Sequence, residues 1–238
     1  MKIIHKIGLS AYLVFGGNCL LAQDVEQGQS IDNYAVEYLH IAEKQAVLYS
    51  GNKQDWHPRA LNHPYLNETQ YVKARLSYRK IIYPGELLRL DLSRDELVIL
   101  SPNYYNIVLS PENVDYAELD GQTIIYFRRD SLPGSPSTGY YALLHSDKCK
   151  VLKKQTAALK TVASYSFDLE YVQSTNFYLY KDGAYYPIRT KSGFLKVLQP
   201  YKKELKRFIS ANKLSFRNNT GEFLIRTVRE YEKLSGSP

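Results

Sequence analysis

From Tyr71 onwards, apolar residues recur at every second position, and this spacing limits the possible folds more than any other feature of the chain. In the first such segment the even-numbered positions are apolar and the odd-numbered positions are polar: Val72, Ala74, Leu76 and Tyr78 alternate with Lys73, Arg75, Ser77 and Arg79. Successive side chains of a strand point to opposite faces of a sheet. The segment therefore predicts a strand with one face in water, which is typical of antiparallel sheets.

Turn signals divide the following residues into further short strands. After Pro84-Gly85, three leucines at 88, 90 and 92 alternate with Arg89 and Asp91, and residues 97–100 form an apolar run typical of a strand buried on both faces. Asp120-Gly121 and Asp182-Gly183 are strong signals for two-residue hairpins. A third hairpin is predicted through Ser146-Asp147, and residues 131–139 form a loop rich in Pro, Gly and Ser.

These signals together predict nine to eleven strands with local connections, which is an antiparallel β-meander. The spacing leaves open whether the sheet stays open, folds into a sandwich or closes into a barrel. Before it, a helix is expected from Asn33 to Tyr49, followed by an irregular segment over 52–68 that contains His57-Pro58 and His63-Pro64.

After residue 190 the apolar period becomes helical. A short turn over 194–198 ends at Pro200, and a helix with Leu205, Phe208 and Ile209 on one face follows. Asn219 and Glu222 have the spacing of a capping box for a last helix. The expected fold is α+β and mostly β, with segments 23–68, 69–190 and 191–238 in one folding unit.

The first 22 residues predict export from the cytoplasm. Two lysines, at 2 and 6, precede the short apolar run 7–15, and the small residue Ala22 precedes the expected cleavage site. Cys19 leaves a lipid-modified cysteine as an alternative, although Asn18 suits such a site poorly. No later apolar run approaches the roughly 18 residues of a membrane helix, so we expect no transmembrane span. We expect the mature chain in the periplasm or at the periplasmic face of the outer membrane.

Charge is unevenly distributed along the mature chain. Residues 189–238 hold twelve Lys and Arg against four acids, whereas residues 23–188 hold seventeen against twenty. A basic tail favours an anionic partner, and in the cell envelope that means anionic lipid or glycan, or another envelope protein, rather than nucleic acid. The candidate contacts share one face of the expected helix: Lys202, Lys203, Lys206 and Arg207. The alternative is a solvated helix face with no partner.

Tyrosine is the compositional outlier, with 22 copies against one tryptophan. Three pairs fall in expected strands, where one ring should face the core and its neighbour should face outward: Tyr104-Tyr105, Tyr140-Tyr141 and Tyr185-Tyr186. Sheet propensity explains the pairs without a function. They are also candidates for an aromatic platform that binds sugar rings, apolar ligands or a partner protein.

Motifs for catalysis or cofactor binding are missing from the sequence. Cys149 is the only cysteine after cleavage, so no intramolecular disulfide can form, and we expect a buried thiol on the same face as Val151. His57 and His63 match no metal-ligand spacing. Phosphate-binding and hydrolase motifs do not occur. We therefore expect no cofactor, no metal and no enzymatic activity.

Several segments of the chain resemble a family of uncharacterised exported proteins of Gram-negative envelopes: residues 45–51 (QAVLYSG), 95–100 (DELVIL), 182–187 (DGAYYP), 195–198 (LKVL) and 203–205 (KEL). The resemblance implies an exported protein with a single folding unit. It implies no activity and no binding residues.

The function expected from these observations is that of a non-enzymatic accessory or binding protein, periplasmic or associated with the outer membrane. One alternative is a carrier that holds a lipid or other apolar ligand between sheet and helices. Another is a hydrolase whose site is assembled from dispersed residues.

Overall fold

The computed structural model describes residues 42, 45–55, 57–66, 71–162 and 168–236. The chain divides into two compact units, 1–47 and 48–238. The expected signal peptide over 1–22, with Cys19, lies outside the described residues, as does most of the expected leading helix. Residues 42 and 45–48 are helical.

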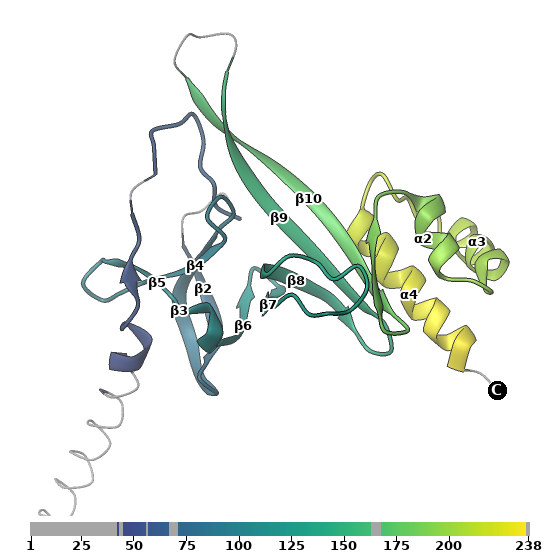
Figure 1. The fold of residues 1–238 in the computed structure, drawn as a ribbon, viewed down its shortest axis with the longest axis horizontal. Helices are drawn as coiled ribbons and strands as arrows, with labels where there is room; N and C mark the ends of the chain where they lie inside the picture. Colours follow the sequence, from purple (N-terminus) through teal and green to yellow (C-terminus); the bar gives the residue numbers. More distant parts are fainter. Residues whose placement is uncertain (1–41, 43–44, 56, 67–70, 163–167, 237–238) are drawn as a thin grey trace, which may run out of the picture. The chain divides into compact units, whose positions relative to one another are not determined.

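Eleven strands of the described chain form one antiparallel sheet (Figure 1). They are β1 (Asn52–Lys53), β2 (Val72–Tyr78), β3 (Ile81–Asp91), β4 (Glu96–Leu100), β5 (Asn106–Val108), β6 (Val114–Leu119), β7 (Gln122–Phe127), β8 (Gly139–Ser146), β9 (Lys150–Thr161), β10 (Leu169–Lys181) and β11 (Ala184–Ile188). Their order across the sheet is β1-β5-β4-β3-β2-β6-β7-β8-β9-β10-β11. Two meanders, β2–β5 and β6–β11, therefore meet where β2 pairs with β6. The predicted fold class is confirmed, and the sheet has an open strand order.

Hairpin turns follow the sequence signals at three places and depart from them at one. The hairpin predicted through Ser146-Asp147 joins β8 to β9, with Ser146 paired to Lys150. Asp120-Gly121 and Asp182-Gly183 join their strands with positive φ at both residues, as the expected turn type requires. The β2–β3 turn lies at Arg79-Lys80, where φ is +52° and +64° without any glycine. Pro84-Gly85 instead lies inside β3, opposite a register shift in β2. The third strand thus begins earlier than predicted, because Pro84-Gly85 forms a bulge and not a turn.

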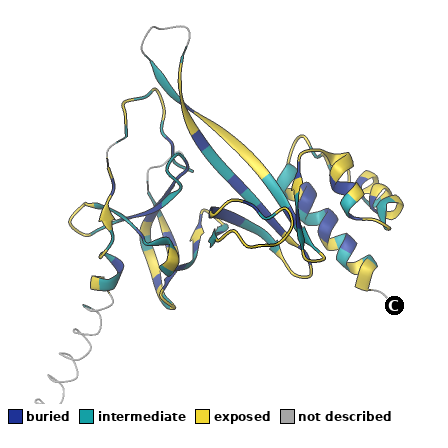
Figure 2. Ribbon diagram, in the orientation of Figure 1, coloured by how far each residue is buried: buried dark blue, intermediate teal, exposed yellow. Residues whose placement is uncertain are grey.

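The β9–β10 hairpin is longer than the sequence indicates. Its strands pair from Leu169–Thr161 to Tyr180–Lys150. The sequence marks the turns on either side of this hairpin, Ser146-Asp147 and Asp182-Gly183, but not its length. Residues 172–176 of β10 are exposed (Figure 2) and carry no alternation of apolar and polar side chains. Hydrophobic periodicity gives no signal for a strand of this kind.

Three helices follow the sheet: α2 (Lys191–Val197), α3 (Lys202–Ala211) and α4 (Thr220–Gly236). Asn219 Oδ1 accepts a hydrogen bond from the Glu222 amide at 3.0 Å. The Asn219 side-chain amide lies 3.4 Å from the Glu222 carboxylate. The predicted capping pair at the start of α4 is therefore confirmed.

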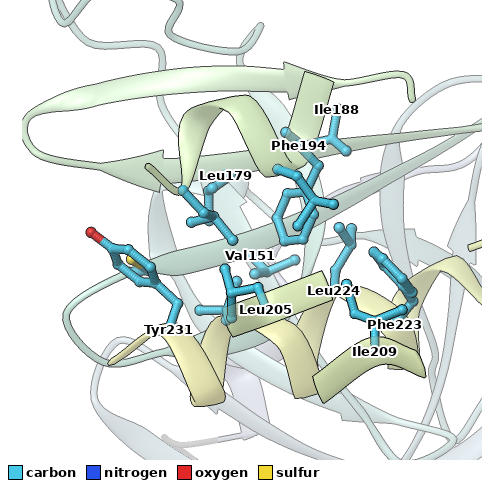
Figure 3. Packing of buried hydrophobic residues seen from close by; sticks show 13 residues of the cluster. Val151, Leu179, Ile188, Phe194, Leu205, Ile209, Phe223, Leu224 and Tyr231 are labelled. Carbon is cyan, nitrogen blue, oxygen red and sulfur yellow. The ribbon is translucent and has the colours of Figure 1, made fainter. Parts of the chain in front are cut away.

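The helices cover one face of the second meander through an apolar cluster (Figure 3). Val151, Leu179 and Ile188 supply the strand side of this cluster. The helix side includes the buried residues Phe194 and Leu195 of α2, Leu205 and Ile209 of α3, and Phe223, Leu224 and Val228 of α4. The predicted apolar face of α3 is confirmed. Cys149 lies in the same cluster as Val151 and is 2% exposed, as expected for a structural thiol.

The opposite face of this meander is covered by the 131–139 loop. Pro133 O accepts from the Tyr185 amide at 2.8 Å, and the Tyr141 hydroxyl donates to Ser137 O at 2.8 Å. Gly134 has φ of +70°, and a Cβ there would lie 2.0 Å from Tyr185 O. Glycine is thus required where the loop touches β11, and the contact also protects an edge strand.

Candidate functional site

An open groove of about 840 Å³ lies between the helix-facing side of β8–β10 and the beginning of α4. Strand residues Leu144, Lys153, Thr175 and Phe177 form one wall. The other wall consists of the α3–α4 connection and the first turns of α4, from Arg217 to Glu222 and then Ile225, Arg226 and Arg229. The groove exists because α4 packs on the sheet through Leu224 and Val228 and leaves its neighbouring face at a distance from the strands.

The lining of this groove is strongly basic. It holds the four cations Lys153, Arg217, Arg226 and Arg229 and a single acid, Glu222. Among the described residues, no ion pair joins Arg217 or Arg229 to an acid. A hollow lined by one sign of charge concentrates counter-ions and favours anionic ligands.

Lys153 brings a cation into the floor of the groove from β9. Its Nζ donates to Gln122 Oε1 at 2.5 Å, and no acid pairs with it in the described part of the chain. Burial lowers the pKa of Lys153, because the charged form loses hydration. An anion in the groove would offset this loss.

Glu222 leaves most of the positive charge uncompensated. Its carboxylate lies 3.5 Å from Arg226 Nη1, and Arg226 also donates to Asn212 Oδ1 at 2.8 Å. Both side chains of this ion pair are about half exposed, so the pair contributes little to the free energy of unfolding. The Glu222 amide in the first turn of α4 is already bound by Asn219 Oδ1.

A second hollow, of about 750 Å³, adjoins the first. One side of it is formed by residues 189–192, where β11 leads into α2. The other side is formed by residues 214–217 of the α3–α4 connection. Arg217 lines both hollows, and Arg189 and Lys191 add two further cations. The α3–α4 connection therefore separates two basic hollows that share one arginine.

The cations predicted from the helix pattern lie elsewhere. Lys203, Lys206 and Arg207 are exposed on α3, and Lys202 is half-buried at its first turn. None of the four lines either hollow. Three of the four are thus exposed on α3, while the groove is formed by other basic residues of the same tail.

The tyrosine pairs do not come together on one surface. Tyr104 and Tyr105 are 84% and 54% exposed and precede β5, whereas Tyr140 and Tyr141 of β8 are each 1% exposed. Tyr185 is buried and Tyr186 is half-buried. The expectation that each pair has one inward and one outward ring is wrong for the first two pairs. The 131–139 loop accounts for the burial of Tyr141, because it covers that side of the meander.

A buried polar cluster lies apart from the groove, where the 52–66 segment meets β3 and β10. Asp91 is 0% exposed. Its Oδ1 accepts from the Ser93 amide and hydroxyl at 2.9 Å and from the Arg94 amide at 3.1 Å. Its Oδ2 accepts from Gln54 Nε2 at 2.9 Å and from His57 Nε2. The carboxylate therefore joins the covering segment to the end of β3.

His57 in this cluster is bound at both ring nitrogens. Nε2 donates to Asp91, and Nδ1 forms a hydrogen bond with the Tyr171 hydroxyl of β10 at 3.0 Å. A catalytic histidine beside a carboxylate presents its other nitrogen to the reacting group, whereas here a buried tyrosine occupies it. We interpret the cluster as a polar clamp: Asp91, His57 and Tyr171 tie the 52–66 segment to two strands.

Arg89 completes the polar clamp from β3. It is 7% exposed, and its guanidinium carbon lies 4.2 Å and 4.5 Å from the ring centroids of Tyr65 and Tyr71. Its Nη2 donates to Gln54 Oε1 at 2.7 Å. Burial raises the pKa of Tyr71 to about 12, so the ring remains neutral. The 52–66 segment thus covers the polar face of β3, the face that carries Arg89 and Asp91.

The described residues contain no group of three or more His, Cys, Asp and Glu placed to hold a metal ion. In the same ranges, no helix combines the length and the apolarity needed to cross a bilayer. Burial raises the pKa of the Cys149 thiol to about 11, which suits a packing role and not a nucleophile.

Comparison of the chain with protein families, with curated proteins and with solved structures gives no match. The groove was missed at the level of sequence because its cations are separated by up to 76 positions, from Lys153 to Arg229. The one available signal was the excess of basic residues after position 188, which marks the tail but does not identify the face.

Proposed function

We propose that the protein is a non-enzymatic binding protein of the cell envelope that holds an anionic ligand, a lipid headgroup or a glycan, in the groove beside α4. The observation that carries the proposal is the lining of that groove, which has four cations and one acid. The predicted export and the basic tail support the same class of function, since envelope lipids and glycans are rich in anionic groups.

Two features of the lining favour binding over mere solvation of charge. Lys153 keeps its cation in a partly desolvated place without an acidic partner among the described residues. Leu144, Phe177 and Ile225 add apolar walls, which exclude water and strengthen charge-assisted hydrogen bonds. The role of carrier between sheet and helices has less support, because side chains of the apolar cluster fill that space.

The test compares two variants with the same change in charge. Arg217→Gln/Arg229→Gln removes two groove cations, and Lys203→Gln/Lys206→Gln removes two exposed cations of α3. Binding to anionic phosphatidylglycerol vesicles and to polygalacturonate is measured at low salt by titration calorimetry or sedimentation.

We expect the groove variant to lose at least tenfold in affinity, because charged hydrogen bonds contribute about 1.5–3 kcal/mol each. The α3 variant should remain within about threefold of wild type, because Lys203 and Lys206 line neither hollow. Equal losses in the two variants, or no binding of either probe by wild type, would overturn the proposal.

A further inference from the structure

We infer that the ligand is an extended acidic glycan that occupies both basic hollows and contacts Arg217, which lies between them. The inference rests on the proposed function. The two hollows are continuous along the chain, since residues 214–217 line one and residues 217–222 line the other. Arg217 belongs to both. A ligand that reached only one hollow would leave the cations of the other without a counter-charge.

Each hollow contributes its own cations to this path. Arg189 and Lys191 lie at one end, Arg217 lies in the middle, and Arg226 with Arg229 lies at the other end. Arg189, Arg217 and Arg229 are all exposed and form no ion pair with an acid within the described ranges. A series of separated cations fits a chain that carries charge at intervals better than one compact anion.

Neutral polar side chains line the same hollows as these cations. Thr175 and Asn218 line the first hollow and Ser192 lines the second. In the part of the chain that the structure describes, no hydrogen bond of these three side chains to another group is seen, so they can bind ligand hydroxyls. A lining with both cations and neutral hydroxyl and amide groups fits a polymer whose monomers carry both carboxylates and hydroxyls.

The same lining does not suit nucleic acid. Binding of single strands uses aromatic side chains on which bases stack. The aromatic residues here are Phe177 and Phe216, both half-buried and packed against the apolar cluster. Phe216 also meets Phe223 edge-on, with ring centroids 5.3 Å apart. Their faces are thus engaged inside the protein.

The experiment measures affinity against the length of a linear acidic oligosaccharide. The mature chain is titrated with galacturonate oligomers of increasing length, with neutral malto-oligosaccharides as matched controls, at one low salt concentration. We expect the affinity for galacturonate to rise at least tenfold once the oligomer spans both hollows, because the second contact becomes intramolecular. The neutral series should show no such rise.

The matched variant is Arg189→Gln/Lys191→Gln, which removes cations from the second hollow only. It should abolish the gain with length, so that long oligomers bind no more tightly than short ones. Thermal unfolding of the variant checks its fold, because Lys191 lies over the Phe223 ring at 5.7 Å. Affinity independent of length, or a gain that survives in this variant, would overturn the inference.

Three further outcomes separate this inference from the proposed function. Normal binding of short oligomers or vesicles without a gain with length refutes the extended ligand and leaves the anion-binding groove intact. Tighter binding of a single-stranded oligonucleotide or of anionic vesicles than of long galacturonate, at the same salt, also refutes the glycan. Absence of binding to all anionic probes refutes the proposed function itself.

Discussion

Two regions of this sheet bury their side chains by opposite means. The second meander is joined to α2–α4 by an apolar cluster in which Phe194, Leu205 and Val228 are each 0% exposed (Figure 3). The 52–66 segment is joined to β3 and β10 by the polar clamp, with Asp91 at its centre. Both contacts are centred on buried side chains, yet only the apolar one has a sequence signature.

The contrast indicates that the two regions tolerate change differently. An apolar cluster loses stability in proportion to the volume that is removed. A buried carboxylate with five donors leaves several groups unsatisfied when it is lost, so its removal costs more than the hydrogen bonds are worth. The open groove lies beside the apolar region, where substitutions of exposed cations leave the core untouched.

The largest effect is expected from the polar clamp. Asp91→Ala should lower the free energy of unfolding by about 3–5 kcal/mol, because His57 and Gln54 lose their buried acceptor. Asp91→Asn should cost less, since it retains an oxygen for the Ser93 and Arg94 amides. Equilibrium urea unfolding measures both variants. A loss below about 1 kcal/mol for Asp91→Ala would show that the clamp contributes little.

The apolar cluster should respond to volume alone. Leu224→Ala, at a site 1% exposed, should cost about 2–5 kcal/mol through the cavity that it leaves. Ile225→Ala is the matched control, because Ile225 is half-buried in the wall of the groove. The same urea unfolding should give it a clearly smaller loss. Equal losses would mean that α4 is not held on the sheet by the packing described.

Much of the apolar region could be predicted from sequence, because its signals are local. The Asp-Gly pairs at 120 and 182 fix two hairpins, and the capping pair at 219 and 222 fixes the start of α4. The apolar faces of the helices follow from spacing within one turn. Local signals suffice wherever a short segment determines its own conformation.

The polar clamp and the groove could not be predicted, since both depend on which distant residues meet. His57 and Asp91 are 34 positions apart and Tyr171 is 114 positions from His57. The cations on α3 have helical spacing, which makes them recognisable in the sequence. Arg217 lies in the α3–α4 connection, where the residues show no such spacing. Exposure to a hollow is a property of packing, and charge patterning alone does not report it.

A smaller effect is expected from pH at Cys149. Burial raises the pKa of its thiol to about 11, above the ordinary value near 9. Between these values the unfolded thiol ionises while the folded one keeps its proton, so stability falls as pH rises from about 9 to 11. The fall in wild type should exceed that in Cys149→Ala by up to about 2 kcal/mol.

Urea unfolding of wild type and Cys149→Ala at pH 8 and pH 10.5 measures this difference. The contributions of other groups that titrate at alkaline pH, such as the Tyr71 hydroxyl, are the same in the two proteins and cancel. Parallel curves would show that the thiol does not ionise differently on folding. Rapid labelling of the native thiol at neutral pH would contradict its burial.

The central claim is that the groove beside α4 binds the ligand, and hydrogen exchange with and without polygalacturonate tests it most directly. We expect ligand-dependent protection in residues 212–229 and in the groove-facing parts of β9 and β10, with no change in the 52–66 segment or on the exposed face of α3. Protection confined to residues 202–211, or shared equally by the polar clamp, would contradict the account and place the ligand elsewhere.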